Sequence, residues 1–204
     1  MDNPKKTGIL GGTFNPVHNG HLILAQNALE TLELEKVLFI PCARPPHKSC
    51  VNLIDARHRA EMIESAIDRD PRFELSEIEL RRGGVSYAVD TLMELRSQFP
   101  DRTFYFIIGG DTLKELHLWR RIYDLLEMCV FAVFPRPPLN LNSIAAADIE
   151  LEPPWPEKLL NNVFAGRRIE ISSSEIRYRI AEGMSIRYLV PQAVEMYIAE
   201  HGLY

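Results

Sequence analysis

Cysteine is scarce in this chain of 204 residues, with three copies at unrelated spacings. Three scattered thiols cannot form the disulfide framework of a small secreted domain. Cys42, His47 and Cys50 would supply only three metal ligands, at a spacing unlike that of the common zinc sites. We therefore expect neither disulfides nor a metal ion held by protein side chains.

Long apolar runs are also missing. No stretch approaches the roughly 20 apolar residues that a membrane-spanning helix needs. The first six residues, MDNPKK, contain no apolar core of a signal peptide. These absences favour a cytoplasmic protein with no membrane partner.

A surplus of basic residues is absent too, because 28 acidic side chains outnumber 23 basic ones and the formal net charge is −5. Proteins that bind DNA or RNA usually present a basic face, so we expect no nucleic-acid partner. A small anionic ligand needs only a local cluster of donors and is compatible with this net charge.

Short apolar runs alternate with helical patterns along the chain. This alternation predicts an α/β fold, namely a Rossmann-like, doubly wound parallel sheet with helices on both faces and a small C-terminal helical part. We expect one domain over residues 1–204, with an irregular excursion at about 137–166 and C-terminal helices at about 173–204. The expected strands are 7–10, 36–40, 72–76 with extended chain after it, 103–108, 129–134 and 168–171, and the expected helices are 20–32, 56–67, 87–99, 112–118, 122–126, 174–181 and 191–201.

The residues that follow the first expected strand, 11–21, read GGTFNPVHNGH. The glycines allow a tight turn and let phosphate oxygens approach backbone N–H groups. His18 and His21 are three residues apart where a helix begins, so both imidazoles can point to one side near its positive end. That arrangement suits an anion and a phosphoryl transition state. The glycines match neither the dinucleotide fingerprint G-x-G-x-x-G nor the P-loop.

An H-x-x-H pair alone is more often two ordinary polar or metal-binding histidines, but the whole string is far more specific. It resembles the G-x-F-x-P-x-H-x-G-H segment of the nucleotidyltransferase superfamily that carries the H-x-G-H signature. A second segment, ISSSEIR at 171–177, resembles that superfamily's I-S-S-T-x-I-R, although by itself it could be an ordinary helix cap. The resemblance implies that His18, His21 and Arg177 stabilise nucleotidyl transfer. It implies further ATP contacts from Gly11, Gly12, Thr13, Phe14, Lys48, Ser172 and Ser174.

Three further segments resemble the nicotinate mononucleotide adenylyltransferases within that superfamily. They are PPHK at 45–48, GGD at 109–111 with WR at 119–120, and SYAVDTL at 86–92. In that family the acid meets a ribose, the tryptophan stacks on the pyridine ring, and the helix start receives the nicotinate carboxylate. The resemblance therefore implies mononucleotide contacts from Tyr87, Ala88, Asp111 and Trp119. Arg136, which follows the strand expected at 129–134, resembles a family arginine near the nucleotide and is expected to contact the mononucleotide as well.

The resemblance implies an enzyme of NAD biosynthesis that transfers AMP from ATP to nicotinate mononucleotide and releases pyrophosphate. It also implies Mg²⁺, bound mainly through the ATP phosphates, and leaves homo-oligomerisation open. Ala88 replaces a family threonine, so nicotinamide mononucleotide remains an alternative acceptor. Pantetheine-phosphate adenylyl transfer and a non-catalytic, nucleotide-binding role on the same scaffold also remain open. We further expect Asp55, Arg57 and Arg59 to form a solvated helix face.

Overall fold

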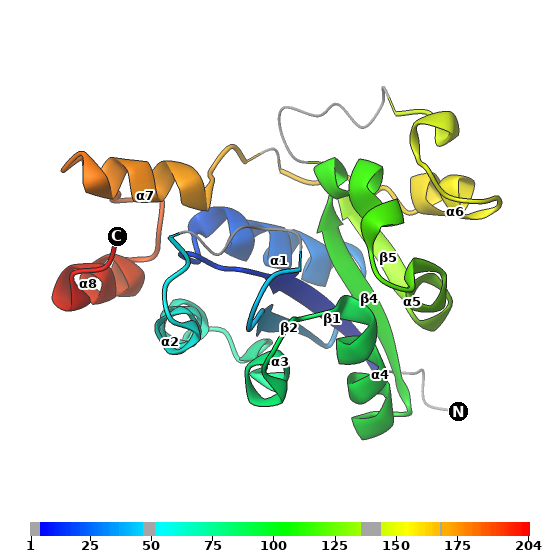
Figure 1. Cartoon of the computed structure of the whole chain (residues 1–204), viewed down its shortest axis with the longest axis horizontal. Coiled ribbons are helices and arrows are strands. Elements are labelled where there is room, and N and C mark those ends of the chain that lie inside the picture. The colour runs from blue at the N-terminus through cyan, green and yellow to red at the C-terminus, as the bar shows by residue number, and fades with distance from the viewer. Residues whose placement is uncertain (1–4, 47–51, 136–143, 168) are drawn as a thin grey trace. The chain divides into compact units, whose positions relative to one another are not determined.

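The computed structural model describes residues 5–46, 52–135, 144–167 and 169–204. Five parallel strands form one sheet in the order β3-β2-β1-β4-β5, with helices around it, which confirms the predicted Rossmann-like fold (Figure 1). Thr7 lies opposite Phe104 in the β1–β4 register, and Ile107 lies opposite Ala132 in the β4–β5 register. The strands are β1 (Lys5–Gly12), β2 (Lys36–Pro41), β3 (Phe73–Leu75), β4 (Arg102–Gly109) and β5 (Val130–Phe134).

Helices occupy the segments between and after the strands. Among the described residues, none of them is both long and apolar enough to cross a membrane. The α-helices are α1 (Asn19–Thr31), α2 (Ala56–Ile67), α3 (Ile78–Arg82), α4 (Ala88–Gln98), α5 (Ile122–Met128), α6 (Trp155–Asn161), α7 (Ser173–Ala181) and α8 (Gln192–His201), and the 3-10 helices are η1 (Gly110–Leu118) and η3 (Ala146–Asp148).

Three stretches differ from the sequence-based expectation. Helix α3 lies where extended chain was expected, because five residues are too few to display a helical period. The described residues of the strand expected at 168–171 are not in a strand. Within the stretch expected to be irregular, η3 and α6 form two short helices.

The chain divides into two compact units. The first unit comprises Met1–Leu10, Leu24–Val37 and Tyr87–Ile169, and the second comprises Gly11–Ile23, Leu38–Ser86 and Glu170–Tyr204. Each unit therefore combines segments that are far apart in the sequence.

The core of the first unit is built on β1, β4 and β5, of which β4 and β5 run side by side (Figure 1). Buried aromatic rings fill it, and those of Phe106 and Phe131 stack with their centroids 5.4 Å apart. Each such side chain contributes about 1.5–3 kcal/mol by leaving water. Gly8 lies at the closest approach, since a Cβ there would be 2.8 Å from Leu34 Cδ1 and 3.0 Å from Ile107 Cδ1. A side chain at position 8 would therefore force neighbouring core side chains to shift.

In the second unit, α8 packs against α2 through a polar cluster. The Tyr197 hydroxyl lies 2.7 Å from His58 Nδ1 and donates a hydrogen bond to the Glu61 carboxylate. The His201 ring stacks on Tyr197 with the centroids 4.0 Å apart. Burial and the Glu61 carboxylate raise the pKa of Tyr197 to about 12. The phenol therefore stays protonated at neutral pH and keeps donating to Glu61.

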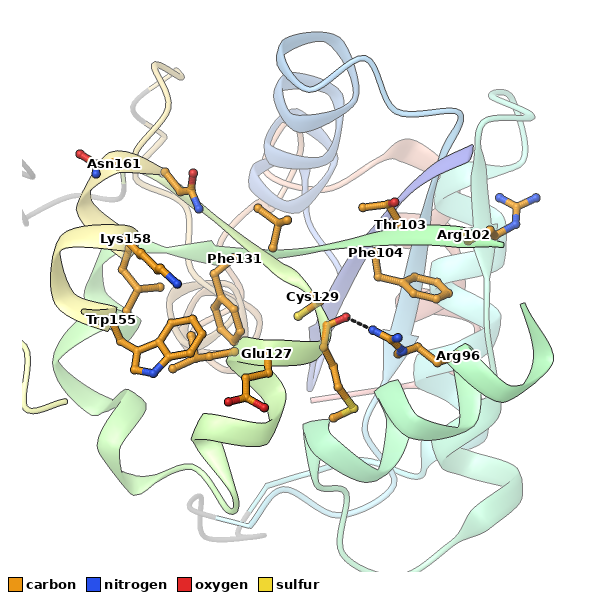
Figure 2. A pocket seen from close by; sticks show the side chains of 15 residues that line it. Arg96, Arg102, Thr103, Phe104, Glu127, Cys129, Phe131, Trp155, Lys158 and Asn161 are labelled. Carbon is orange, nitrogen blue, oxygen red and sulfur yellow. Dashed lines mark hydrogen bonds between the residues drawn. The ribbon is translucent and has the colours of Figure 1, made fainter. Parts of the chain in front are cut away.

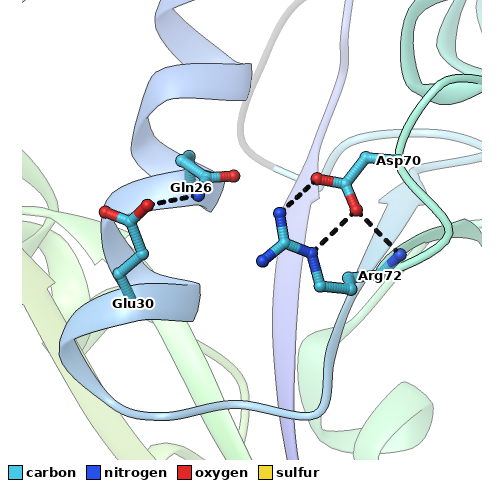
Figure 3. A network of polar contacts seen from close by, with 4 residues as sticks. All are labelled: Gln26, Glu30, Asp70 and Arg72. Carbon is cyan, nitrogen blue, oxygen red and sulfur yellow. Dashed lines mark hydrogen bonds and ion pairs between the residues drawn. The ribbon is translucent and has the colours of Figure 1, made fainter.

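Local polar pairs stabilise one segment in each unit (Figure 3). In α1, Gln26 Nε2 donates to Glu30 Oε1 one turn further on, at 2.5 Å. Before β3, Arg72 donates from its backbone N and its Nε to Asp70 Oδ1 at 3.0 and 2.9 Å, and from Nη2 to Oδ2 at 2.6 Å. These bonds hold the pKa of the Asp70 carboxyl below its ordinary value. An exposed pair of this kind is worth about 0.2–1 kcal/mol.

Candidate active site

The segment after β1 forms a turn in the second unit with a strained residue at its centre. The strand continues through Gly12, two residues beyond the expected end, and Gly12 O accepts a hydrogen bond from Cys42 N at 2.9 Å. Phe14 has φ 47°, a left-handed conformation that costs a non-glycine residue about 1–3 kcal/mol. Its ring is 1% exposed and packs edge-on against His21, with the centroids 4.9 Å apart. The surrounding contacts must therefore hold this turn in place.

The structure brings His18 and His21 together at the start of α1. Their rings stack with the centroids 3.7 Å apart, and His18 is 2% exposed. The backbone N of His18 donates to His21 Nδ1 at 3.2 Å. Because Nδ1 accepts this bond, the proton of neutral His21 lies on Nε2, and that nitrogen can donate to an anion. The positive end of the helix favours negative charge at the same place.

The second signature segment begins α7 and is bonded to the first. Ser173 Oγ donates to Pro16 O at 2.9 Å, and Arg177 Nη1 donates to Asn15 O at 2.7 Å. Arg177 Nη2 also donates to Ser174 Oγ at 3.2 Å. Thus residues about 160 positions apart in the sequence lie in one cluster within the second unit.

The N-cap residue of α7 is Ser172. Its Oγ accepts a hydrogen bond from Glu175 N at 3.1 Å. Accepting that bond leaves the hydroxyl hydrogen available as a donor. Ser174 is exposed, so its hydroxyl is accessible as well as bonded to Arg177.

Arg59 is a buried part of this cluster and not a member of a solvated helix face. It is 1% exposed, and its guanidinium donates to Thr13 O at 2.8 Å, Ile54 O at 3.2 Å and Ala43 O at 3.4 Å. The expectation for this residue was therefore wrong, because its charge was given more weight than its place on the helix. Arg59, Ile63 and Ile67 recur every four residues and share the buried face of α2.

The residues expected to contact the mononucleotide belong to the first unit where they are described. Tyr87 is the N-cap residue of α4, and Ala88 is its first helical residue. The Arg120 guanidinium lies over the Tyr87 ring, 4.6 Å from its centroid. Asp111 is exposed in the first turn of η1.

Trp119 ends η1 and packs against the aromatic core. Its ring meets Phe106 edge-on with the centroids 5.6 Å apart and tilts against Phe131 at 6.3 Å. The residue is half-buried, so part of its indole is held by the core while part stays accessible. Core packing and ligand stacking are thus compatible roles for this side chain. Two expected site residues, Lys48 and Arg136, lie outside the described residues.

A cavity of about 750 Å³ lies in the first unit at the amino ends of β4 and β5 (Figure 2). Arg96 Nη1 donates a hydrogen bond to Met128 O at 2.6 Å, drawn as the dashed line at Arg96 in Figure 2. The Lys158 ammonium lies 4.5 Å from the centroid of the Trp155 ring. Open α/β sheets bind ligands beyond the carboxyl ends of their strands. This cavity lies at the other end of β4 and β5 from such a ligand site. Of the expected ATP-binding and mononucleotide-binding residues that the structure describes, none lines it.

The donors in the signature segments suit phosphate better than a metal ion. They are imidazole, guanidinium and hydroxyl groups, whereas Mg²⁺ prefers carboxylate oxygens, phosphate oxygens and water. Over residues 5–46, 52–135, 144–167 and 169–204, no group of three or more histidine, cysteine, aspartate or glutamate side chains is arranged to hold a metal ion.

Comparison with known proteins finds a family that covers most of the chain. The cytidylyltransferase-like family model matches residues 9–179. A protein of Lachnoclostridium phytofermentans named "probable nicotinate-nucleotide adenylyltransferase" is 42% identical over 200 residues, covering 98% of this chain and 99% of the relative. A protein of Pelobacter propionicus with the same name is 45% identical over 211 residues, covering 98% of each.

A solved structure shares the fold. The Plasmodium falciparum nicotinic acid mononucleotide adenylyltransferase complexed with NaAD superposes with a TM-score of 0.74 at 20% identity, covering 98% of this chain and 97% of that one.

Proposed function

Because the chain belongs to the cytidylyltransferase-like family and, within it, to the nicotinate-nucleotide adenylyltransferases, we propose that it transfers AMP from ATP to nicotinate mononucleotide. The products are nicotinate adenine dinucleotide, the precursor of NAD, and pyrophosphate. The observation that carries the proposal is the joining of the two signature segments by the Arg177–Asn15 and Ser173–Pro16 hydrogen bonds.

The residues proposed to bind ATP belong to the second unit. The turn from Gly11 to Phe14 offers backbone N–H groups to phosphate oxygens, and Lys48 adds a cation. His21 Nε2 and the start of α1 face developing negative charge, while the α7 residues Ser172, Ser174 and Arg177 hold the pyrophosphate. A guanidinium and an oriented helix N-terminus are the groups that proteins use for this purpose.

The residues proposed to bind the acceptor mononucleotide belong to the first unit. The N–H groups of Ala88 and Val89, the first two residues of α4, receive the nicotinate carboxylate, because the helix has no preceding carbonyls for them. The next N–H group, that of Asp90, donates to Tyr87 O at 3.1 Å. The Arg120 cation over the Tyr87 ring adds positive charge near that helix start. The exposed part of Trp119 stacks on the pyridine ring, Asp111 accepts hydrogen bonds from a ribose, and Arg136 binds close to the nucleotide.

The reaction needs no covalent enzyme intermediate. A phosphate oxygen of the mononucleotide attacks the α-phosphorus of ATP, the new P–O bond forms, and the bond to the β-phosphate oxygen breaks. Pyrophosphate leaves with the electron pair of the broken bond. His18, His21 and Arg177 act by holding the triphosphate and by stabilising the charge that grows on its oxygens.

A divalent cation accompanies the ATP, and we take it to be Mg²⁺ bound mainly through the phosphates. Mg²⁺ usually keeps several waters and takes substrate phosphates as ligands, which agrees with the nitrogen and hydroxyl donors of this site. Such a cation would neutralise part of the triphosphate charge, while His18, His21 and Arg177 would orient the phosphate groups.

The proposal is tested by mixing the protein with ATP and, in separate reactions, nicotinate mononucleotide, nicotinamide mononucleotide or phosphopantetheine. We expect pyrophosphate release and a product with the mass of nicotinate adenine dinucleotide. His18→Ala and His21→Ala should each lower kcat about 10²-fold or more. His117→Ala, the same deletion at a histidine in the first unit outside the signature segments, should leave kcat unchanged.

Two outcomes would overturn the proposal. A dephospho-coenzyme A product would place the chain with the pantetheine-phosphate enzymes. ATP binding without pyrophosphate release from any acceptor would make it a nucleotide-binding protein that does not catalyse transfer.

A further inference from the structure

Residues on both sides of the strained Phe14 are held by side chains that the proposed reaction does not use. On one side, Thr13 O accepts a 2.8 Å hydrogen bond from the buried Arg59. On the other side, the Asn15 side chain is 5% exposed, and its Oδ1 accepts a 2.9 Å hydrogen bond from the Tyr204 hydroxyl. Left-handed non-glycine residues persist only where their surroundings fix them. Arg59 and Tyr204 therefore act as two clamps on this turn.

Asn15 is fixed by further bonds at the same point. Its Nδ2 donates to Asn52 O at 2.8 Å, and its backbone O accepts the Arg177 guanidinium at 2.7 Å. The hydroxyl of Tyr204 thus bonds to the same residue that Arg177 holds. Burial raises the pKa of Tyr204, so its hydroxyl remains a donor at every physiological pH.

Local structure brings Tyr204 to this position. Helix α8 is anchored on α2 by Tyr197, and it ends at Gly202, which has φ 59° in the left-handed region that glycine adopts without strain. Leu203 N then donates back to Ile198 O at 3.1 Å, which closes the helix and directs the next residue toward Asn15.

The clamped turn is connected to the proposed catalytic group. The Phe14 ring packs edge-on against the His21 imidazole, with the centroids 4.9 Å apart, and it is also packed against Phe39 at 5.9 Å. Because the ring contacts both neighbours, we expect a shift of the Phe14 backbone to displace the His21 ring. A buried, close-packed side chain transmits such displacements instead of absorbing them.

We infer that Arg59 and Tyr204 are positioning residues that set the place of His21 through the strained Phe14. The inference rests on the proposed role of His21 in transfer. Neither residue needs to touch ATP or the acceptor, and both act by fixing the turn on either side of Phe14.

The experiment is a double-mutant cycle that combines Tyr204→Phe with His21→Ala. Removing the Tyr204 hydroxyl takes away one neutral, buried hydrogen bond and should lower kcat about fivefold, with KM for nicotinate mononucleotide unchanged. In the His21→Ala background the same substitution should change kcat by less than about twofold, because the group it positions is gone. Tyr188→Phe, which removes the hydroxyl of a residue that is 83% exposed, is the matched control and should leave kcat unchanged in both backgrounds.

Arg59→Lys tests the other clamp, since one ammonium keeps the charge but cannot bond three carbonyls in the geometry of a guanidinium. It should lower kcat as Tyr204→Phe does and lose that effect in the His21→Ala background. If the loss of Arg59 unfolds the chain, Tyr204→Phe alone decides the question. An equal loss of kcat in both backgrounds, or a lower melting temperature with unchanged kcat, would overturn the inference.

A second readout does not depend on turnover. In Tyr204→Phe the NMR signals of the His21 ring should shift, while those of His117, in the first unit, should not. If the wild type forms no dinucleotide, the proposed function fails and this spectrum still decides the inference. A moved His21 ring supports it, and an unmoved one contradicts it.

Discussion

Replacing Arg177 by alanine should lower both the stability of the free protein and its affinity for ATP. Arg177 Nη1 donates a part-buried, charge-assisted hydrogen bond to Asn15 O at 2.7 Å. Such bonds are worth about 1.5–3 kcal/mol, and losing this one leaves a carbonyl of the signature turn without its donor. We therefore expect Arg177→Ala to lower the free energy of unfolding by about 1.5–3 kcal/mol in the absence of any ligand.

The same substitution should also weaken ATP binding, because it removes the proposed contact between Arg177 and the phosphates. If the guanidinium binds the leaving pyrophosphate, removing it should cost ATP a further 1.5–3 kcal/mol or so, which raises its Kd about 10- to 150-fold. Arg177→Lys keeps the charge but loses the two guanidinium nitrogens that bond Asn15 O and Ser174 Oγ. Compared with Arg177→Ala, it should therefore recover part of the ATP affinity and little of the stability. Ser174→Ala removes a neutral hydroxyl and should cost about 1 kcal/mol.

Two measurements separate these effects. Chemical denaturation without ligand gives the free energy of unfolding, and titration calorimetry gives the Kd of ATP. Arg179→Ala is the matched control, because Arg179 lies on the same helix and donates to Ser185 O at 2.9 Å, outside both signature segments. It should leave the ATP Kd unchanged. Wild-type ATP affinity in Arg177→Ala would refute the phosphate role, and unchanged stability would refute the tether between the segments.

Three other predictions concern the first unit. Trp119→Ala should raise KM for the nicotinate and nicotinamide mononucleotides by similar factors in steady-state kinetics, because stacking reads the ring and not its substituent; a changed ratio between them would contradict stacking. Burial raises the pKa of the Cys129 thiol to about 12, so at pH 9 only about one molecule in 1,000 carries the thiolate. Mass spectrometry after alkylation should therefore find Cys129 unmodified in the folded protein and modified in urea, and modification without urea would show that the thiol is accessible. Gly8→Ala should lower the free energy of unfolding by about 1–3 kcal/mol in denaturant titrations, because its Cβ would meet Leu34 and Ile107; unchanged stability would mean that the core has room there.

Long elements with a clear period could be predicted from the sequence, whereas contacts between distant segments could not. Helix α2 lies where the apolar pattern places it, because its 12 residues display a helical period unambiguously. Strand β4, with eight residues, lies where an unbroken apolar run predicts a buried strand. The five residues of α3 do not, so that helix was missed.

In the candidate site, too, local sequence patterns were predictable and contacts between distant segments were not. The two signature strings identify candidate residues without a structure, since their residue types suit phosphate chemistry. Arg59 was assigned to solvent because charged residues are rarely buried, and only the tertiary structure shows three carbonyls around its guanidinium. The Tyr204–Asn15 hydrogen bond joins positions 189 residues apart, and no local pattern encodes such a pair.

Acceptor choice tests the central claim most directly. Backbone N–H groups at the start of α4, with the Arg120 cation beside Tyr87, should favour the charged nicotinate over the neutral nicotinamide. Ala88 lacks the hydroxyl of the family threonine, but a contact through backbone N–H groups does not require it. The measurement is kcat/KM for the two mononucleotides with saturating ATP and Mg²⁺. We predict a preference of about 10²-fold for nicotinate mononucleotide, and equal use of the two acceptors would contradict the assignment.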